Sequence, residues 1–205
     1  GATGREGSDR GAAGLAPTGT RDPFGLRRAA IGVVQPLIEH DIDLSLEAAL
    51  QAAAALQPIP ADGAVLQAVR EFITGRLRVV LMDRGFRYDV VDAILAQQAD
   101  NPAGAARAVR QLAGWVGRED WSTILPAYAR CVRITRDLEE KFPLKAGALV
   151  EAEEKELFAA LEQAEGRSRR PGSADDLFHA FLPMIPAVTA FFDKVLVMAE
   201  DEAVR

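Results

Sequence analysis

Apolar residues recur along this chain at the spacing of an α-helix, and no stretch alternates between apolar and polar residues as a half-buried β-strand does. The most regular stretch runs from Trp121 to Leu138. At about 100° per residue, its apolar side chains fall on one half of a helix. These residues are Trp121, Ile124, Leu125, Tyr128, Cys131, Val132, Ile134 and Leu138. The pattern predicts an all-α protein in which this helix buries one flank, with Trp121 and Tyr128 in the core.

Three arginines follow one another at intervals of three residues on the other half of the same helix: Arg130, Arg133 and Arg136. A charged row on a core helix is most often an ordinary solvated face. The alternative is a phosphate-facing edge, since the planar guanidinium group matches the geometry of phosphate oxygens. The helix by itself leaves both interpretations open.

Capping residues and helix breakers divide the rest of the chain into further predicted helices. Asp22 and Pro23 are expected as the N-cap and first turn of a helix that runs to His40. Ser45 and Asp62 are expected to cap the next two. Gly85 is expected to end the helix that Asp62 caps. The predicted ranges are 46–56, 63–82, 88–99, 102–115, 150–164 and a last region from about 174 to 199.

Several prolines fall inside these predicted helices. Pro36 is expected to bend or end the first one, because proline lacks the backbone N–H that the helix needs. Pro126 either kinks the central helix or marks its true first turn. Pro183 and Pro186 are expected to interrupt the last helical region, which then resumes with the stripe Val188, Phe191, Phe192, Val195 and Ala199.

The composition excludes several classes of protein but does not identify the function. No run of the 205 residues approaches the ~18–20 apolar residues that span a bilayer, and the first residues carry no apolar signal-peptide core. Cys131 is the only cysteine, so no internal disulfide can form. One cysteine and two histidines also leave little for a transition-metal site. We therefore expect a cytoplasmic protein that does not span a membrane and binds no metal.

The net charge of −6 argues, for the chain as a whole, against nucleic acid as a partner, but the charges are unevenly distributed. Between Leu66 and Arg136 there are 11 arginines and 7 acidic residues. Between Asp137 and Glu165 there are 9 acidic residues and 3 lysines. Such polarity lets a protein present a basic face to a polyanion while the whole molecule stays acidic.

No group of residues in the sequence assembles an independent active site. His40-Asp41 is the only His-Asp pair, and a metal site of that kind needs a second histidine and another carboxylate. The one other histidine, His179, lies among phenylalanines, where a structural role is expected. Cys131 is on the apolar flank of its helix and is expected to be a core residue. No phosphate-binding glycine loop or nucleophile-elbow motif occurs.

A second basic element is the stretch from Gly166 to Ser173, which carries Arg167, Arg169 and Arg170 among Gly, Pro and Ser. Such a stretch is most often a mobile, solvated loop. It is also well suited to reach a phosphate backbone. Together with the arginine row, it makes a helical nucleic-acid-binding module a candidate function.

Three stretches carry a family resemblance. Gly14 to Ala30, GLAPTGTRDPFGLRRAA, resembles the PTGS/T-K/R-DPF-x-LRRAA signature of the β subunit of bacterial glycyl-tRNA synthetase. Phe191 to Arg205, FFDKVLVMAEDEAVR, is similar to its FFD-x-V-x-VMAED-x-x-x-R stretch. Tyr128 to Ile134, YARCVRI, falls where the family has Y-K-R-V-x-N-I in an anticodon-binding domain of the DALR type, although Ala129 and Arg133 replace its Lys and Asn.

The resemblance implies a role within an α2β2 glycine–tRNA ligase. It implies that the α subunit carries the catalytic core that uses ATP, Mg and glycine, and that this chain contains no catalytic residue and no cofactor of its own. It also implies that the chain binds glycine tRNA, without binding DNA. The expected tRNA-binding residues are Arg130, Arg133, Arg136, Arg167, Arg169 and Arg170.

The domain organisation that follows is a C-terminal portion of such a β subunit. Residues 1–16 are expected to be a flexible remnant of a preceding domain, residues 17–120 a helical body, and residues 121–205 an anticodon-binding helical bundle whose last helix is truncated. Two alternatives remain. One is a helical protein-interaction scaffold without RNA contact. The other is the anticodon domain of an arginine- or cysteine-type synthetase, against which the DPFGLRR stretch speaks.

Overall fold

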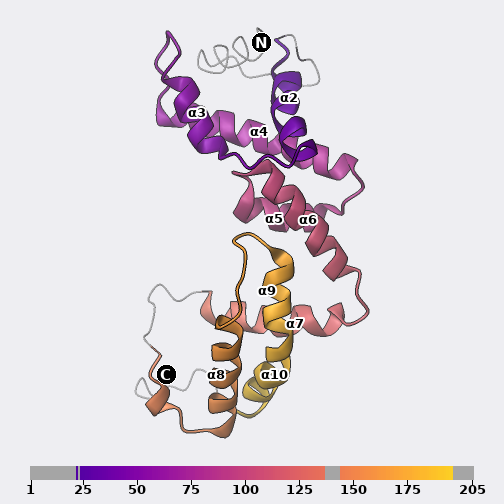
Figure 1. Cartoon of the computed structure of the whole chain (residues 1–205), viewed down its shortest axis with the longest axis vertical. Coiled ribbons are helices and arrows are strands. Elements are labelled where there is room, and N and C mark those ends of the chain that lie inside the picture. Colours follow the sequence, from indigo (N-terminus) through magenta and orange to yellow (C-terminus); the bar gives the residue numbers. More distant parts are fainter. Residues whose placement is uncertain (1–21, 23, 137–143, 196–205) are drawn as a thin grey trace. The chain divides into compact units, whose positions relative to one another are not determined.

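The apolar periodicity of the sequence becomes a set of helices in the computed structural model, which describes residue 22 and residues 24–136 and 144–195 (Figure 1). These residues contain helices, turns and bends and no β-strand, so the all-α prediction is confirmed. Among the described helices, none combines the length and apolar content that crossing a bilayer requires. The chain divides into two compact units, residues 1–113 and 114–205.

Unit 1 is organised around its longest helix, α4 (Gly63–Asp83), which packs against α2 (Leu26–Glu39), α3 (Leu46–Ala54) and α5 (Tyr88–Gln98). Two leucines in the C-terminal half of α4, Leu77 and Leu81, are fully buried at 0% exposure. The helix α6 (Pro102–Val116) follows, and the division between the units falls inside it.

Local capping fixes several of these helix ends as the sequence predicts. The Ser45 hydroxyl accepts a hydrogen bond from the Ala48 N–H at 3.1 Å, and the Asp62 carboxylate accepts one from the Val65 N–H at 2.9 Å. Both groups satisfy a backbone donor that has no partner within its own helix. Gly85 ends the segment after α4 with a φ of 88°, a left-handed conformation that costs glycine little.

The start of α2 corrects one prediction. The helix begins at Leu26, after Gly25 with a φ of 68°, rather than at Asp22 and Pro23. Asp22 still helps to close this turn, because its main-chain oxygen accepts from the Gly25 N–H at 3.1 Å. Pro23 lies outside the described residues.

Unit 2 contains α7 (Trp121–Thr135), the 3₁₀ turn η1 (Ala146–Ala148), α8 (Ala152–Glu165), α9 (Ala174–Phe181), η2 (Leu182–Met184) and α10 (Ile185–Lys194). The helix α10 packs against α7 and α8. One apolar cluster of the unit is built on Ala127, Phe181 and Val188, which contribute from α7, α9 and α10.

The prolines of the predicted helices are accommodated in different ways. Helix α2 continues to Glu39 beyond Pro36, and α7 begins at Trp121, so Pro126 lies inside the helix and does not mark its first turn. Pro183 and Pro186 occupy the first turns of η2 and α10, where a missing N–H costs little. Helix α10 ends at Lys194, since Val195 is extended, and Ala199 lies outside the described residues.

Candidate nucleic-acid interface

The helix α7 buries a narrower flank than the sequence predicts. Ile124 and Ala127 are 1% and 6% exposed, and Tyr128 and Cys131 are half-buried against the apolar cluster of unit 2. Leu125 and Val132 were expected on this flank, yet they are 45% and 40% exposed. At about 100° per residue they lie roughly 80–100° away from Ile124, beyond the reach of the neighbouring helices. They belong to the outer face of α7.

The aromatic residues of α7 contribute to the core as predicted. The Phe178 ring of α9 lies between three rings, with centroid distances of 5.3 Å to Trp115, 5.3 Å to Trp121 and 6.0 Å to Tyr128. Tyr128 also meets the Phe181 ring edge-on at 5.5 Å. This ring cluster fixes α7 against α9 and thereby determines which side of α7 remains accessible.

Arg130 is held at the edge of α7 that adjoins α10. Both of its terminal nitrogens donate to the Asp193 carboxylate at 3.2 Å, and its guanidinium lies 5.3 Å from the centre of the Phe192 ring. Two stretches that carry the family resemblance, 128–134 and the segment from Phe191, are joined by this contact. The positive charge of Arg130 is therefore largely compensated by the Asp193 carboxylate.

Arg133 and Arg136 differ from Arg130. Both are exposed, and neither side chain makes an ion pair or hydrogen bond with any residue in the part of the chain that the structure describes. The three arginines do not form a straight row. Each step of three residues turns about 60° around the helix, so Arg130 and Arg136 stand at opposite edges of the exposed face with Arg133 between them.

The loop between α8 and α9 is attached to α9. The Asp176 carboxylate accepts from the Arg170 main-chain N–H at 2.7 Å and from two guanidinium nitrogens of Arg170 at 2.9 Å each. Arg167 donates to the His179 main-chain oxygen at 3.2 Å. Arg169 is exposed and has no partner among the described residues. Among the described residues, the loop thus offers two guanidinium groups, those of Arg167 and Arg169, that form no ion pair with a carboxylate.

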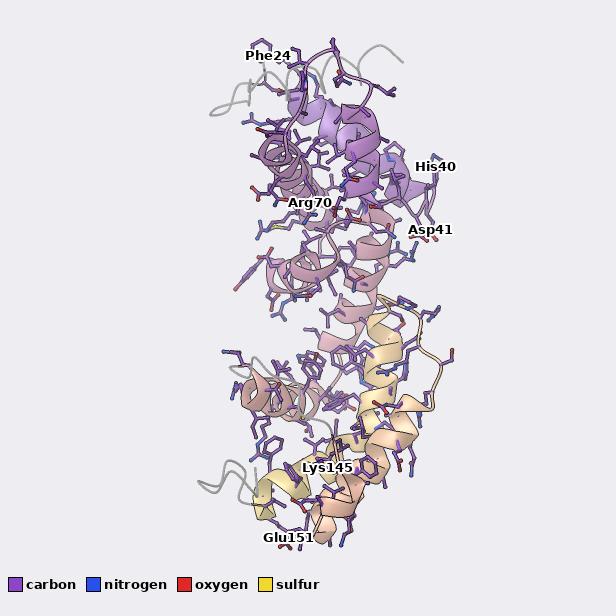
Figure 2. The ribbon with its side chains drawn as sticks, turned by 90° about the vertical axis from the view of Figure 1, so that its left-hand side faces the viewer. Phe24, His40, Asp41, Arg70, Lys145 and Glu151 are labelled. Carbon is purple, nitrogen blue, oxygen red and sulfur yellow. The ribbon has the colours of Figure 1, made fainter. Side chains whose placement is uncertain are left out.

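The arginine row and the loop do not lie on the same side of unit 2. Figure 2 shows α9 between them, with α7 on one side and the loop on the other. The contacts agree with this view, because Asp176 binds the loop while Phe178 contacts α7, and the two positions are about 160° apart around α9. The six predicted arginines therefore form two separate groups.

Two cationic or titratable side chains that were not predicted as site residues, Arg118 and His179, lie against the Trp115 ring. The Arg118 guanidinium is 4.6 Å from the centre of the Trp115 ring, and the His179 ring meets the same indole at 5.0 Å. Trp115 is positioned by a hydrogen bond from its indole nitrogen to Asp175 at 2.9 Å. Since Trp115 and Asp175 are 60 residues apart, no local pattern in the sequence points to this arrangement.

The residues considered for catalysis or metal binding have structural contacts. Asp41, which is labelled in Figure 2, forms an ion pair with Arg107, and Arg107 also donates a hydrogen bond to Asp43 at 2.5 Å. Within the described residues, no three His, Cys, Asp or Glu side chains are grouped in a way that would hold a metal ion. Burial raises the pKa of the Cys131 thiol, which keeps it protonated and weakens it as a nucleophile.

The Arg170–Asp176 contact predicts an acid-dependent stability. The side-chain and main-chain N–H groups of Arg170 hold the pKa of Asp176 well below its usual value. A depressed carboxyl pKa stabilises the fold above the unfolded-state pKa of about 3.9, and this stabilisation is lost as the pH falls through the folded-state pKa. We expect Asp176→Asn to lower the urea midpoint of unit 2 at pH 7, and the difference from the unaltered chain to shrink below about pH 4.

Tryptophan fluorescence during urea unfolding measures this difference. Glu162→Gln provides the control, because that carboxylate is exposed and receives no hydrogen bond to its side chain from the described residues. An Asp176→Asn difference that stays constant from pH 7 to pH 2 would contradict the prediction.

Comparisons with known proteins agree with the resemblance. The sequence model described as "Glycyl-tRNA synthetase beta subunit" matches residues 11–96. The chain is 36% identical over 204 residues to the glycine–tRNA ligase β subunit of Moorella thermoacetica, with 94% of this chain and 29% of the relative covered. It is 37% identical over 201 residues to the corresponding β subunit of Rhodospirillum centenum, covering 92% of this chain and 28% of the relative.

A plant protein gives a similar match. The chain is 32% identical over 196 residues to the chloroplastic/mitochondrial glycine–tRNA ligase 2 of Arabidopsis thaliana, covering 95% of this chain and 18% of the relative. The chain thus spans less than a third of the length of each of these relatives.

Proposed function

Since this chain belongs to the glycyl-tRNA synthetase β-subunit family, we propose that it supplies tRNA binding to a glycine–tRNA ligase. In this proposal residues 121–205 hold the anticodon region of glycine tRNA, and an α subunit catalyses ATP-dependent glycylation within an α2β2 complex in the cytoplasm. ATP and Mg bind to the α subunit. The chain alone does not form glycyl-adenylate.

The observation that carries this proposal is the exposed face of α7. Between Trp121 and Arg136 there are three arginines and no acidic residue. Arg133 and Arg136 are exposed and have no partner within the described residues. An unpaired guanidinium is available to exchange its counterions for a phosphate, whereas one already bound to a carboxylate is not. Arg130 and Arg170, which form ion pairs with Asp193 and Asp176, then contribute less than Arg133, Arg136, Arg167 and Arg169.

A helical protein-interaction scaffold is the second candidate. It is favoured by the exposure of Leu125 and Val132, since apolar side chains on an outer face are often covered by a partner. In that case the only effect of Arg133 and Arg136 is to stabilise the C-terminal end of α7, where positive charge interacts favourably with the helix dipole. The two candidates differ in whether RNA affinity depends on salt and on these arginines.

A salt titration tests the proposal. Two or three phosphate contacts at about 0.7 counterions each predict that the affinity for glycine tRNA falls roughly tenfold between 50 and 200 mM salt. Filter binding measures the dissociation constant, and a glycine tRNA whose anticodon stem-loop has been deleted is the control. A dissociation constant that does not change with salt, or that is equal for both RNAs, would contradict the proposal.

A further inference from the structure

We infer that the outer face of α7 is covered by a segment of the same chain, residues 196–205. This inference goes beyond the proposed function, because the occupant of the face is a part of the protein. It starts from the side chains of Leu125 and Val132, which are 45% and 40% exposed. Together with the guanidinium groups of Arg133 and Arg136, they form a surface that we call the α7 strip.

The α7 strip combines apolar surface with positive charge. Taking about 100° per residue, Leu125, Val132 and Arg136 lie within about 40° of one another around the helix, and Arg133 is about 80° from Leu125. Helix α7 has no acidic residue, and Arg133 and Arg136 have no partner within the described residues. A well-matched occupant therefore carries apolar side chains and carboxylates close together.

Residues 196–205 have this composition, although the segment lies outside the described residues. Its sequence is LVMAEDEAVR. The apolar positions 196–198 are followed directly by one alanine and the three acidic positions 200–202. The segment can thus contribute apolar side chains to Leu125 and Val132 and carboxylates to Arg133 and Arg136.

The described end of α10 brings the chain to the edge of the α7 strip. The Asp193 carboxylate accepts from both terminal nitrogens of Arg130 at 3.2 Å, so the last turn of α10 adjoins α7. The helix ends at Lys194, because Val195 is extended, with a φ of −90° and a ψ of 129°. Ten further residues reach as far as about 33 Å, whereas the strip is about 16 Å long from end to end. Every part of the strip is therefore within reach.

The charges on the other side of this chain end disfavour a path over α8. Lys194 donates to the Glu153 carboxylate at 2.7 Å, so the start of α8 also adjoins the end of α10. That start carries Glu151, Glu153 and Glu154 within four residues. Like charges repel and opposite charges attract, so positions 200–202 are repelled by the start of α8 and attracted to α7.

Fluorescence quenching tests which helix the segment covers. The 205-residue chain with Cys131→Ser carries a bimane label on Val132→Cys, and Met198→Trp supplies a quencher that acts at close range. We expect Met198→Trp to remove more than about half of the bimane fluorescence. The matched control carries the label on Val150→Cys, since Val150 is 75% exposed beside the start of α8. There the same quencher is expected to remove less than about a tenth.

Neutralising part of the acidic run tests the physical cause. In the chain labelled at position 132, Glu200→Gln/Glu202→Gln is expected to restore at least about half of the lost fluorescence, because the attraction to Arg133 and Arg136 weakens. Glu162→Gln/Glu165→Gln is the control, since it removes two exposed carboxylates of the same unit and changes the net charge equally. The control pair is expected to leave the quenching unchanged. Circular dichroism verifies that each variant is folded.

Absence of quenching at position 132 would overturn the inference, and so would equal quenching at positions 132 and 150. Equal recovery for the two pairs of substitutions would also overturn it, because a specific contact with the α7 strip requires unequal recovery. None of these results affects the proposed function, since RNA binding by Arg133 and Arg136 does not depend on the segment.

A consequence for RNA binding keeps the two proposals distinguishable. If RNA uses Arg133 and Arg136, it competes with residues 196–205 for the same guanidinium groups. Glu200→Gln/Glu202→Gln is then expected to bind the anticodon stem-loop of glycine tRNA about three- to tenfold more tightly than Glu162→Gln/Glu165→Gln does. Equal affinities together with quenching at position 132 would contradict the proposed function and support the inference.

Discussion

Replacing Phe178 with alanine is expected to lower the free energy of unfolding of unit 2 by about 3–5 kcal/mol. The Phe178 side chain is 6% exposed, and its ring is the one that contacts Trp115, Trp121 and Tyr128. Its removal leaves a cavity among three large rings that helix packing cannot readily close. Because these contacts also attach α7 to α9, the variant should lose RNA binding together with its fold.

The two tryptophans of the chain make this prediction easy to follow. Trp115 and Trp121 both contact Phe178, so tryptophan fluorescence during urea unfolding reports on unit 2. Leu177→Ala is the matched control, since Leu177 precedes Phe178 on the same helix and is 37% exposed. It is expected to cost less than about 1 kcal/mol. Equal midpoints for the two variants would show that the ring cluster does not stabilise the unit.

Features that depend on neighbouring residues in the sequence were predicted well. Ser45 and Asp62 each accept a hydrogen bond from an N–H three residues further on, so a single polar side chain before an apolar run indicates the helix start. The Glu151 N–H donates to the Glu154 carboxylate at 2.9 Å, an equally local capping-box interaction that was not among the predictions. These interactions are complete within one helical turn and need no knowledge of the rest of the fold.

Where a local signal competes with another, the prediction was wrong or incomplete. Asp22 and Pro23 are a good start signal, but Gly25 adopts a left-handed conformation and places the first helical residue at Leu26. Of the two alternatives for Pro126, the first turn of the helix is wrong, because α7 starts five residues earlier and continues past it, and the kink stays a prediction. Proline removes one hydrogen bond, and packing of the buried flank of α7 offsets that loss.

The candidate site required tertiary information that periodicity does not contain. Helical spacing placed Leu125 and Val132 at the margin of the apolar half, and only the positions of α9 and α10 determine that this margin is exposed. The ion pair of Arg130 is formed with a residue 63 positions away. Sequence therefore identified which residues are cationic, while the fold determines which of them remain uncompensated.

That distinction leads to the second large effect. We expect Arg133→Gln/Arg136→Gln to raise the dissociation constant for glycine tRNA about 10- to 100-fold at low salt and to reduce the salt slope by roughly 1.4, since two phosphate contacts at about 0.7 each are lost. Arg130→Gln/Arg170→Gln removes the same formal charge from guanidinium groups that are already bound to Asp193 and Asp176. We expect this control pair to weaken binding less than about threefold.

Filter binding at several salt concentrations compares the two pairs, and circular dichroism verifies that each variant is folded. Each pair of substitutions removes two positive charges, so the two double variants change the net charge of the chain equally. A general electrostatic attraction would therefore give equal effects, because it depends on total charge. Unequal effects in the expected order require that RNA phosphates meet Arg133 and Arg136 individually, whereas equal effects would remove the exposed face of α7 as the binding site.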